Sequence, residues 1–230
     1  KLDDLRFYCN KRVNDNTSVN YATCGRTAYN ALKERLFTGS NAVSSPRIVR
    51  NYDEYVRREV KLPIRDGDKP RWVRHPELDV AAIPVTIPPG VDAQPFPYAR
   101  IADESWTAQR KVRTGQDVFI PCFPFRLETN PAGWPVLRKG SLATFPLTPT
   151  AVAKTMFVDY AHFEGDSGSP VVAYPKNEPL VVGMVFALMR NTSTVSSPFE
   201  ERKTHFPLDL AIAVQSPHVR DTIDRAVGKK

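Results

Sequence analysis

The hydrophobic positions of this chain gather in short runs that are rich in β-branched and aromatic residues, and most runs are bounded by Gly, Pro or Asn. Short runs of this composition are typical of β-strands, whereas a surface helix repeats its apolar positions with a period of about 3.6 residues. Even spacing of such runs predicts an antiparallel β-barrel. In the second half they lie at residues 116–125, 137–147, 154–161, 169–175 and 179–189.

The first half of the chain has its own strand-like runs. The stretch RIVRNYDEYVRREVKLPI (47–64) ends at RDGDKP (65–70), which is a strong turn signal. LDVAAIPV (78–85) follows, and it reads as a buried strand that begins with an aspartate. The proline-rich stretch that comes next predicts a link between two lobes. The expected boundaries are an N-terminal lobe at 1–86, a connector at 87–114 and a C-terminal lobe at 115–230.

The chain ends in a pattern that predicts one more strand and then a helix. Ser216 is suited to the N-cap, and Pro217 is suited to the first helical position. Val219, Ile223 and Val227 are spaced by four residues, which gives the helix one apolar face. Long helices are not expected elsewhere, because the chain contains 21 prolines.

The charge of the chain raises the question of an acidic partner. The net charge is +7, which by itself would suit nucleic acid. The basic residues are nevertheless scattered and do not form a block interleaved with aromatic residues. Nucleic-acid binding is therefore not expected, and neither is membrane insertion, because no apolar run is long enough to span a bilayer.

The cysteines and the known motifs argue against a cofactor. Cys9, Cys24 and Cys122 are an odd number of thiols without a CxxC spacing, so neither a disulfide framework nor a zinc site is expected. No Walker loop, HExxH or GxGxxG occurs, and we expect the protein to use no cofactor. This cysteine usage, together with the lack of a signal peptide, favours the cytoplasm, and a secreted form with a trimmed N-terminus stays open as the alternative.

The stretch FEGDSGSP (163–170) contains the residue best suited to chemistry. Ser167 stands between Asp166 and Gly168, with Gly165 two residues before it. A serine hydroxyl attacks a carbonyl only when a base takes its proton and when donors stabilise the oxyanion that forms. Flanking glycines let the backbone N–H groups turn toward one small space. The same residues would also suit a polar turn before a buried strand.

Four segments together resemble the trypsin- and chymotrypsin-like serine peptidases, in particular the bacterial and HtrA-like members. GDSGSPVV with LVVGMVFA resembles the nucleophile strand and the strand after it, and HPELDVAAIPV (75–85) resembles the segment with the catalytic aspartate. TGQDVFIPCFPF and LDLAIAVQSPHVRDTI resemble the first strand of the second barrel and the closing strand and helix. The resemblance covers about residues 47 to 227. It implies an all-β fold of two antiparallel six-stranded β-barrels with a C-terminal helix.

The resemblance also implies roles for single residues. Ser167 would be the nucleophile, and the N–H groups of Gly165 and Ser167 would form the oxyanion hole. Asp79 would orient and support a protonated imidazole. Without the resemblance, Asp79 could equally be an aspartate that caps a turn at the start of a strand.

The histidine of this family is missing from its expected place. The best match is RTAYNAL (26–32), where Asn30 stands at the position of the general base. An asparagine amide cannot accept and return a proton at neutral pH, so this alignment implies a broken triad. His75, four residues before Asp79, fits turn chemistry better than the role of base.

The resemblance places Ala161 at the base of the pocket for the substrate side chain, where a trypsin-like enzyme has an aspartate. A preference for Lys or Arg is therefore not expected. The next residue, His162, would favour polar or acidic side chains, or is a histidine on a half-exposed loop. The pocket wall would be shallow and suited to a small or modestly apolar side chain. It would consist of Phe186, Ala187 and Leu188.

Two classes of function follow from these residues. The first is a serine endopeptidase that hydrolyses proteins or peptides and that is inactivated in this chain by the loss of its histidine. The second is a non-catalytic protein of the same fold that binds a peptide or a partner protein. A viral polyprotein protease is a weaker third reading, and a flanking or partner domain would regulate either form. An α/β-hydrolase is not expected, because Ser169 replaces the second glycine of GxSxG.

Overall fold

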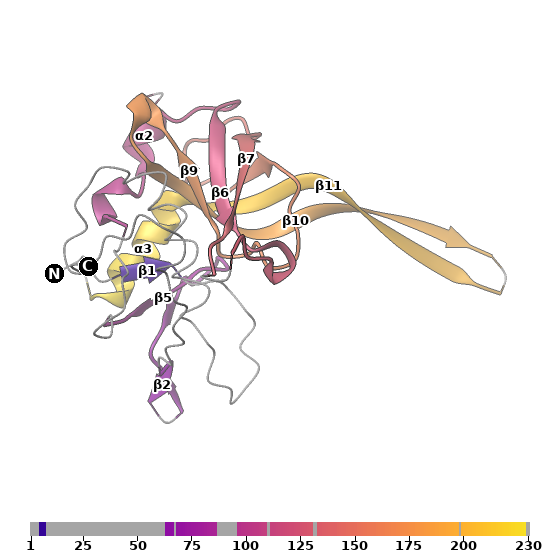
Figure 1. Cartoon of the computed structure of the whole chain (residues 1–230), viewed down its shortest axis with the longest axis horizontal. Coiled ribbons are helices and arrows are strands. Elements are labelled where there is room, and N and C mark those ends of the chain that lie inside the picture. The colour runs from indigo at the N-terminus through magenta and orange to yellow at the C-terminus, as the bar shows by residue number, and fades with distance from the viewer. Residues whose placement is uncertain are drawn as a thin grey trace.

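The computed structural model describes residues 5–7, 63–66, 68–86, 96–109, 111–130, 133–197 and 199–228. Most of the secondary structure in these segments is β, and a helix near the C-terminus, α3 (Ser216–Ala226), packs beside the strands (Figure 1). Within the described segments no helix is both long and apolar enough to cross a membrane.

The second half of the chain forms a closed barrel of six strands in the order β10-β11-β8-β7-β6-β9. All of its neighbours pair antiparallel, and β6 closes the ring on β9 through Val118↔Ala173 and Phe119↔Val172. This confirms the predicted β-barrel. Its strands are β6 (Asp117–Cys122), β7 (Val136–Leu142), β8 (Thr155–Asp159), β9 (Pro170–Ala173), β10 (Leu180–Ser196) and β11 (Glu201–Gln215).

The barrel interior follows from the alternation of side chains along its strands. Val118, Ile120 and Cys122 of β6 all point inward and are fully buried, with Pro121 also covered. They pack in one cluster with Leu142 of β7 and Val158 of β8. Removing each such side chain from water contributes on the order of 1.5–3 kcal/mol to folding, which makes this interior the main source of barrel stability.

Helix α3 joins the barrel to the N-terminal part of the chain. Its buried face carries Val219 and Ile223, as the four-residue spacing predicted, whereas Val227 stands at the C-cap and is exposed. They pack against Val80 and Ala82 of the N-terminal part and against Val172 of the barrel. The helix begins at Ser216 with Gln215 at the N-cap, one residue earlier than expected, and Pro217 still lies in the first turn.

The N-terminal part contains two small sheets in the described residues. One has the order β1-β5-β4, from β1 (Leu5–Phe7), β4 (Val73–Arg74) and β5 (Ala81–Pro84). The other is the hairpin of β2 (Arg65–Asp66) and β3 (Lys69–Pro70), which confirms the turn predicted at 65–70. These strands are too few to make a second six-stranded barrel, and that barrel stays a prediction.

The connector expected at 87–114 has helical elements in its described part. A 3₁₀ turn, η2 (Tyr98–Arg100), precedes the short helix α2 (Glu104–Ala108). Asp103 caps α2 by accepting a hydrogen bond from the N–H of Ser105. Two further 3₁₀ turns, η3 (Pro124–Arg126) and η4 (Pro175–Asn177), follow β6 and β9.

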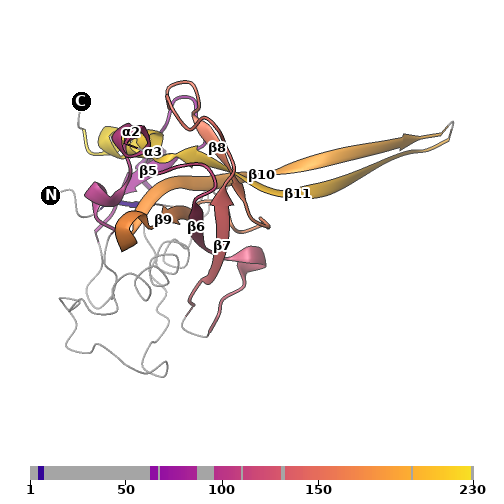
Figure 2. The ribbon, with the colours of Figure 1, turned by 90° about the horizontal axis from the view of Figure 1, so that it is seen from above.

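The outer ends of β10 and β11 leave the barrel as a long two-stranded ribbon (Figure 1). We call residues 190–207 the arm. From above, the arm again projects far beyond all other elements (Figure 2). Its pairing runs from Arg190↔Pro207 to Ser196↔Glu201, and its described side chains are exposed except for the half-buried Thr204. The expected strand at 179–189 therefore covers only the inner part of β10.

Candidate functional site

Ser167 lies on the loop between β8 and β9, and hydrogen bonds hold this loop on both sides. The N–H of Asp166 donates to the carbonyl of Phe163 at 3.1 Å, and the N–H of Ser169 donates to the carbonyl of Asp166 at 3.1 Å. Gly168 donates to Val185 of β10 at 2.7 Å, and Val185 donates back to Ser169 at 2.9 Å. The backbone around Ser167 is therefore fixed to the barrel wall.

The glycines of this loop are required by its shape. Gly165 has φ +101° and Gly168 has φ +90°, both in the left-handed region that favours glycine. A Cβ atom at Gly165 would lie 2.3 Å from the carbonyl oxygen of Phe123, which is far inside contact distance. Glycine is therefore required at position 165 for two reasons, which are its positive φ and its close approach to the end of β6.

The two N–H groups that the resemblance assigns to an oxyanion hole are not used inside the loop. Within the described part of the chain, neither the N–H of Gly165 nor that of Ser167 has a hydrogen-bond acceptor, whereas the N–H groups of Asp166, Gly168 and Ser169 do. Buried or half-buried backbone donors normally find an acceptor. This alternation leaves two donors of the loop available to a bound group.

The hydroxyl of Ser167 is half-buried and donates to the carbonyl oxygen of Phe186 at 3.2 Å. Phe186 lies at a β-bulge, because the pairing of β10 with β11 shifts between Val185↔Ala213 and Ala187↔Ile212. Bulges are frequent next to active sites, since they re-aim single residues. In the segments that the structure describes, no histidine accepts a hydrogen bond from Ser167.

Among the described residues, no hydrogen bond joins Ser167 to Asp79. Asp79 is exposed at the bend before β5, and its carboxylate has no hydrogen bond or ion pair to another described residue. Asn30 lies outside the described residues. The roles predicted for Asp79 and Asn30 therefore stay predictions.

His75 is buried and its contacts match the turn chemistry predicted for it. Its Nδ1 accepts hydrogen bonds from the N–H groups of Glu77 and Leu78, each at 3.1 Å. Its Nε2 is 3.7 Å from a carboxylate oxygen of Asp221 on α3, and its ring meets that of His218 edge-on at 5.6 Å. Burial lowers the pKa of His75, and the neighbouring His218 lowers it further. The lowered pKa favours the neutral form of the ring, whose hydrogen bonds close this turn beside α3.

The residues predicted for the substrate pocket differ in how deeply they are buried. Ala161, Ala187 and Leu188 are half-buried. Phe186 is also half-buried, and it packs on the cluster that α3 shares with β5 and the barrel. His162 is 6% exposed, so it is more deeply buried than a half-exposed loop histidine. The assignment of these residues to a substrate pocket stays a prediction.

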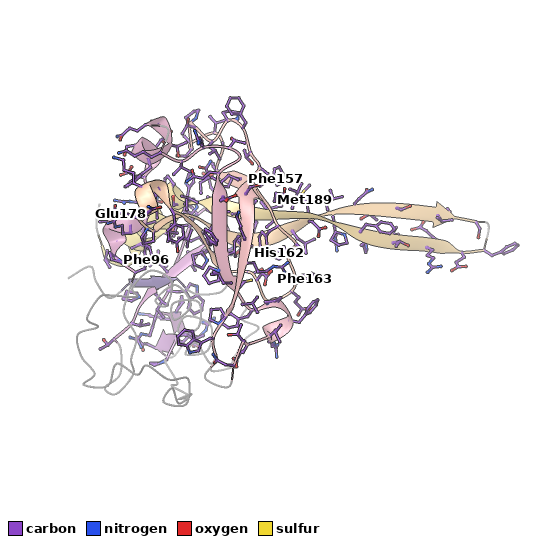
Figure 3. The ribbon with its side chains drawn as sticks, turned by 45° about the horizontal axis from the view of Figure 1, so that its top comes forward. Phe96, Phe157, His162, Phe163, Glu178 and Met189 are labelled. Carbon is purple, nitrogen blue, oxygen red and sulfur yellow. The ribbon has the colours of Figure 1, made fainter. Side chains whose placement is uncertain are left out.

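An aromatic patch beside the Ser167 loop was not predicted from the sequence. The rings of Phe125 and Phe163 lie 5.3 Å apart, and both are exposed. The guanidinium of Arg138 lies 5.1 Å from the ring of Phe163. His162 and Phe163 lie close to each other near the base of the arm (Figure 3). Phe125 has a left-handed backbone conformation (φ 51°). Sequence patterns do not report such a conformation, so they did not reveal this patch.

Neither a metal site nor a similarity to known proteins assigns a role to the described residues. The described residues contain no group of three or more His, Cys, Asp or Glu side chains that would hold a metal ion. No model of a protein family matches the chain, and no curated protein matches its sequence.

Proposed function

We propose that the protein is a serine endopeptidase of the chymotrypsin-like type, in which the barrel of β6–β11 is the second of two six-stranded barrels. The observation that carries the proposal is the Ser167 loop. It combines a half-buried hydroxyl with two backbone N–H groups, on Gly165 and Ser167, that no described acceptor uses. The substrate is a protein or peptide.

The chemistry requires three groups to act in one step. The oxygen of Ser167 attacks the carbonyl carbon of the peptide bond and gives its proton to a base. The carbonyl oxygen becomes an oxyanion, and the N–H groups of Gly165 and Ser167 donate to it. The base then returns the proton to the leaving amine, so that an acyl group stays on Ser167 until water removes it. Asp79 would orient the base.

The base is the missing part of this proposal. With Asn30 at the expected position, this chain has the nucleophile and the donors but lacks the group that accepts the proton. The hydroxyl of Ser167 donates instead to the carbonyl of Phe186, which cannot act as a base. We therefore propose that this polypeptide is a form of the enzyme with low activity.

A fluorophosphonate probe tests the proposal directly, because it reacts with activated serines. We expect slow labelling of the full chain, much faster labelling of Asn30→His, and none when Ser167→Ala is added to either. Mass spectrometry of the labelled peptide must place the probe on Ser167. Absence of labelling in both the original chain and Asn30→His would refute the enzymatic function.

The second candidate is a peptide-binding protein without catalysis. It is favoured by the engaged hydroxyl of Ser167 and by the exposed pair of Phe125 and Phe163 beside it, since exposed aromatic patches mark interaction sites. Binding of a fluorescent peptide library would then survive Ser167→Ala and would fall with Phe163→Ala. Exposed Phe199→Ala, at the far end of the arm, is the matched control.

A further inference from the structure

The residue before Ser167 belongs to a buried group of polar side chains, which we call the Asp166 cluster. It consists of Cys122, Tyr160, His162 and Asp166, and none of the four is more than 6% exposed. They come from the end of β6 and from the loop after β8. The rings of Tyr160 and His162 have centroids 6.0 Å apart, and the charge of Asp166 acts on Cys122, Tyr160 and His162.

Several polar atoms of this cluster have no hydrogen-bond partner. They are both ring nitrogens of His162, the hydroxyl of Tyr160 and the Oδ1 of Asp166. Buried polar atoms nearly always have partners, and each exception calls for an explanation. These atoms belong to three side chains of one cluster, and a ring nitrogen of His162 and the Oδ1 of Asp166 are a donor and an acceptor that can satisfy each other.

The cluster disfavours an isolated charge. Burial raises the pKa of Asp166, and burial lowers the pKa of His162. Their attraction opposes both shifts, since the His162 charge lowers the pKa of Asp166 and the Asp166 charge raises that of His162. Burial raises the pKa of the Cys122 thiol and of the Tyr160 hydroxyl, so both stay neutral. Arg138 of β7 is the one cation that acts on the pair among the described residues.

Asp166 is mechanically linked to the nucleophile. It directly precedes Ser167, its Oδ2 accepts the N–H of Phe163 at 3.0 Å, and its carbonyl accepts the N–H of Ser169 at 3.1 Å. A contact that holds the Asp166 carboxyl in place therefore also helps to hold the backbone of this residue, which is followed directly by the N–H of Ser167.

We propose that His162 is the positioning residue of the Ser167 loop, and that it acts by forming a hydrogen bond to Asp166 in which the two side chains share one proton. Formation of this bond satisfies a ring nitrogen and the Oδ1 together and fixes the N–H groups of Gly165 and Ser167 toward the substrate. Loss of one proton from the pair leaves a net negative charge that burial disfavours, and this weakens the hold on the N–H groups of Gly165 and Ser167. The effect on catalysis rests on the proposed function, whereas the hydrogen bond itself does not.

The first test measures the interaction between His162 and Asp166 and requires no enzymatic activity. The ring ¹⁵N signals of the histidines are titrated by NMR in the full chain and in Asp166→Asn. Because the Asp166 charge raises the pKa of His162, we expect Asp166→Asn to lower that pKa by about one unit or more. His205, which lies on the arm, is the internal control and should not move. An unchanged His162 midpoint would overturn the proposal.

A second variant covers the case in which Asp166→Asn does not fold. In His162→Gln, the pKa of the Asp166 carboxyl is followed by its ¹³C signal. The His162 charge lowers this pKa, so its loss should raise the pKa of Asp166. A pKa of Asp166 that is the same with and without His162 contradicts a shared proton.

The third test measures how fast a fluorophosphonate labels Ser167 in the Asn30→His background, because this rate depends on the shape of the loop. We expect His162→Phe to slow labelling by on the order of 100-fold, because it misplaces the loop. His162→Gln should restore part of the rate and remove the pH limb that belongs to the shared proton. His205→Gln is the matched control. Equal rates and pH profiles for His162→Phe and its parent would overturn the positioning role, whereas no labelling of the parent would refute only the proposed function.

Discussion

Strands β10 and β11 pass through two environments, and the contrast explains what holds each part of the molecule. From Leu180 to Val185, every residue of β10 is buried in the barrel wall. From Arg190 to Ser196, the same strand is fully exposed, and it pairs only with β11. The backbone ladder continues through both regions, so burial of side chains is the difference between them. A two-stranded ribbon alone in water is only marginally stable. A closed barrel is stabilised by the side chains that it buries in its core.

The largest expected effect comes from truncating the barrel core. Leu142 is 1% exposed, and Leu142→Ala should lower the free energy of unfolding by about 2–5 kcal/mol through lost burial and a cavity. Phe206→Ala on the arm, where the ring is 50% exposed, should change it by less than about 0.5 kcal/mol. Urea unfolding of both variants measures the contrast. Equal losses would mean that the arm is packed in solution.

The second effect separates backbone strain from close packing in the Ser167 loop. Gly165→Ala and Gly115→Ala both place a side chain at positive φ, which costs on the order of 1–3 kcal/mol. Only at Gly165 does the new Cβ also meet a backbone atom, the carbonyl oxygen of Phe123. Gly165→Ala should therefore lower the urea midpoint clearly more than Gly115→Ala. A matching decrease in both would show that the loop yields to the clash.

The third effect is a dependence of stability on pH at the contact between α3 and the N-terminal part. The pKa of His75 is lowered in the folded state, so the unfolded state binds its proton first. Its contribution to stability is therefore complete above about pH 6.5 and is lost as the pH falls below that value.

His75→Asn removes the titrating ring and should flatten the fall in melting temperature between about pH 7 and 5. His205→Asn, on the exposed arm, should leave the slope as it is, and the same slope in all three proteins would contradict the role of His75.

The smallest effect is expected from shortening the arm. Replacing residues 193–204 by Asn-Gly joins the paired residues Thr192 and His205 with a two-residue turn. Because the removed side chains contribute little burial, the melting temperature should stay within about 2 °C. A loss of several degrees would show that the arm supports the barrel.

The same contrast decides how much of the fold the sequence predicts. The runs that became β6, β9 and the inner part of β10 were identified because buried strands need unbroken apolar or β-branched residues. The arm was missed because a strand exposed on both faces has no hydrophobic period. Its Thr192, Thr194 and Lys203 would suit any polar loop.

The candidate site was also predicted from the sequence only in part. The Ser167 loop was predicted, because Gly165 and Gly168 record a backbone shape that only glycine adopts readily. The burial of His162 and Asp166 was not predicted, since only the fold shows that both side chains turn inward. The roles of Asp79 and Asn30 depend on residues far apart in the chain, and no local pattern reports such a meeting.

Closure of the barrel has a consequence for behaviour at high concentration. A closed ring leaves no unpaired strand for another molecule to extend, and here β6 pairs with β9 to complete it. On the arm, by contrast, the outer sides of β10 and β11 keep their backbone groups unpaired within the described residues. Self-association into larger aggregates would therefore begin on the arm. The charged side chains of Arg202 and Lys203 protect it there, as charges on exposed strands commonly do.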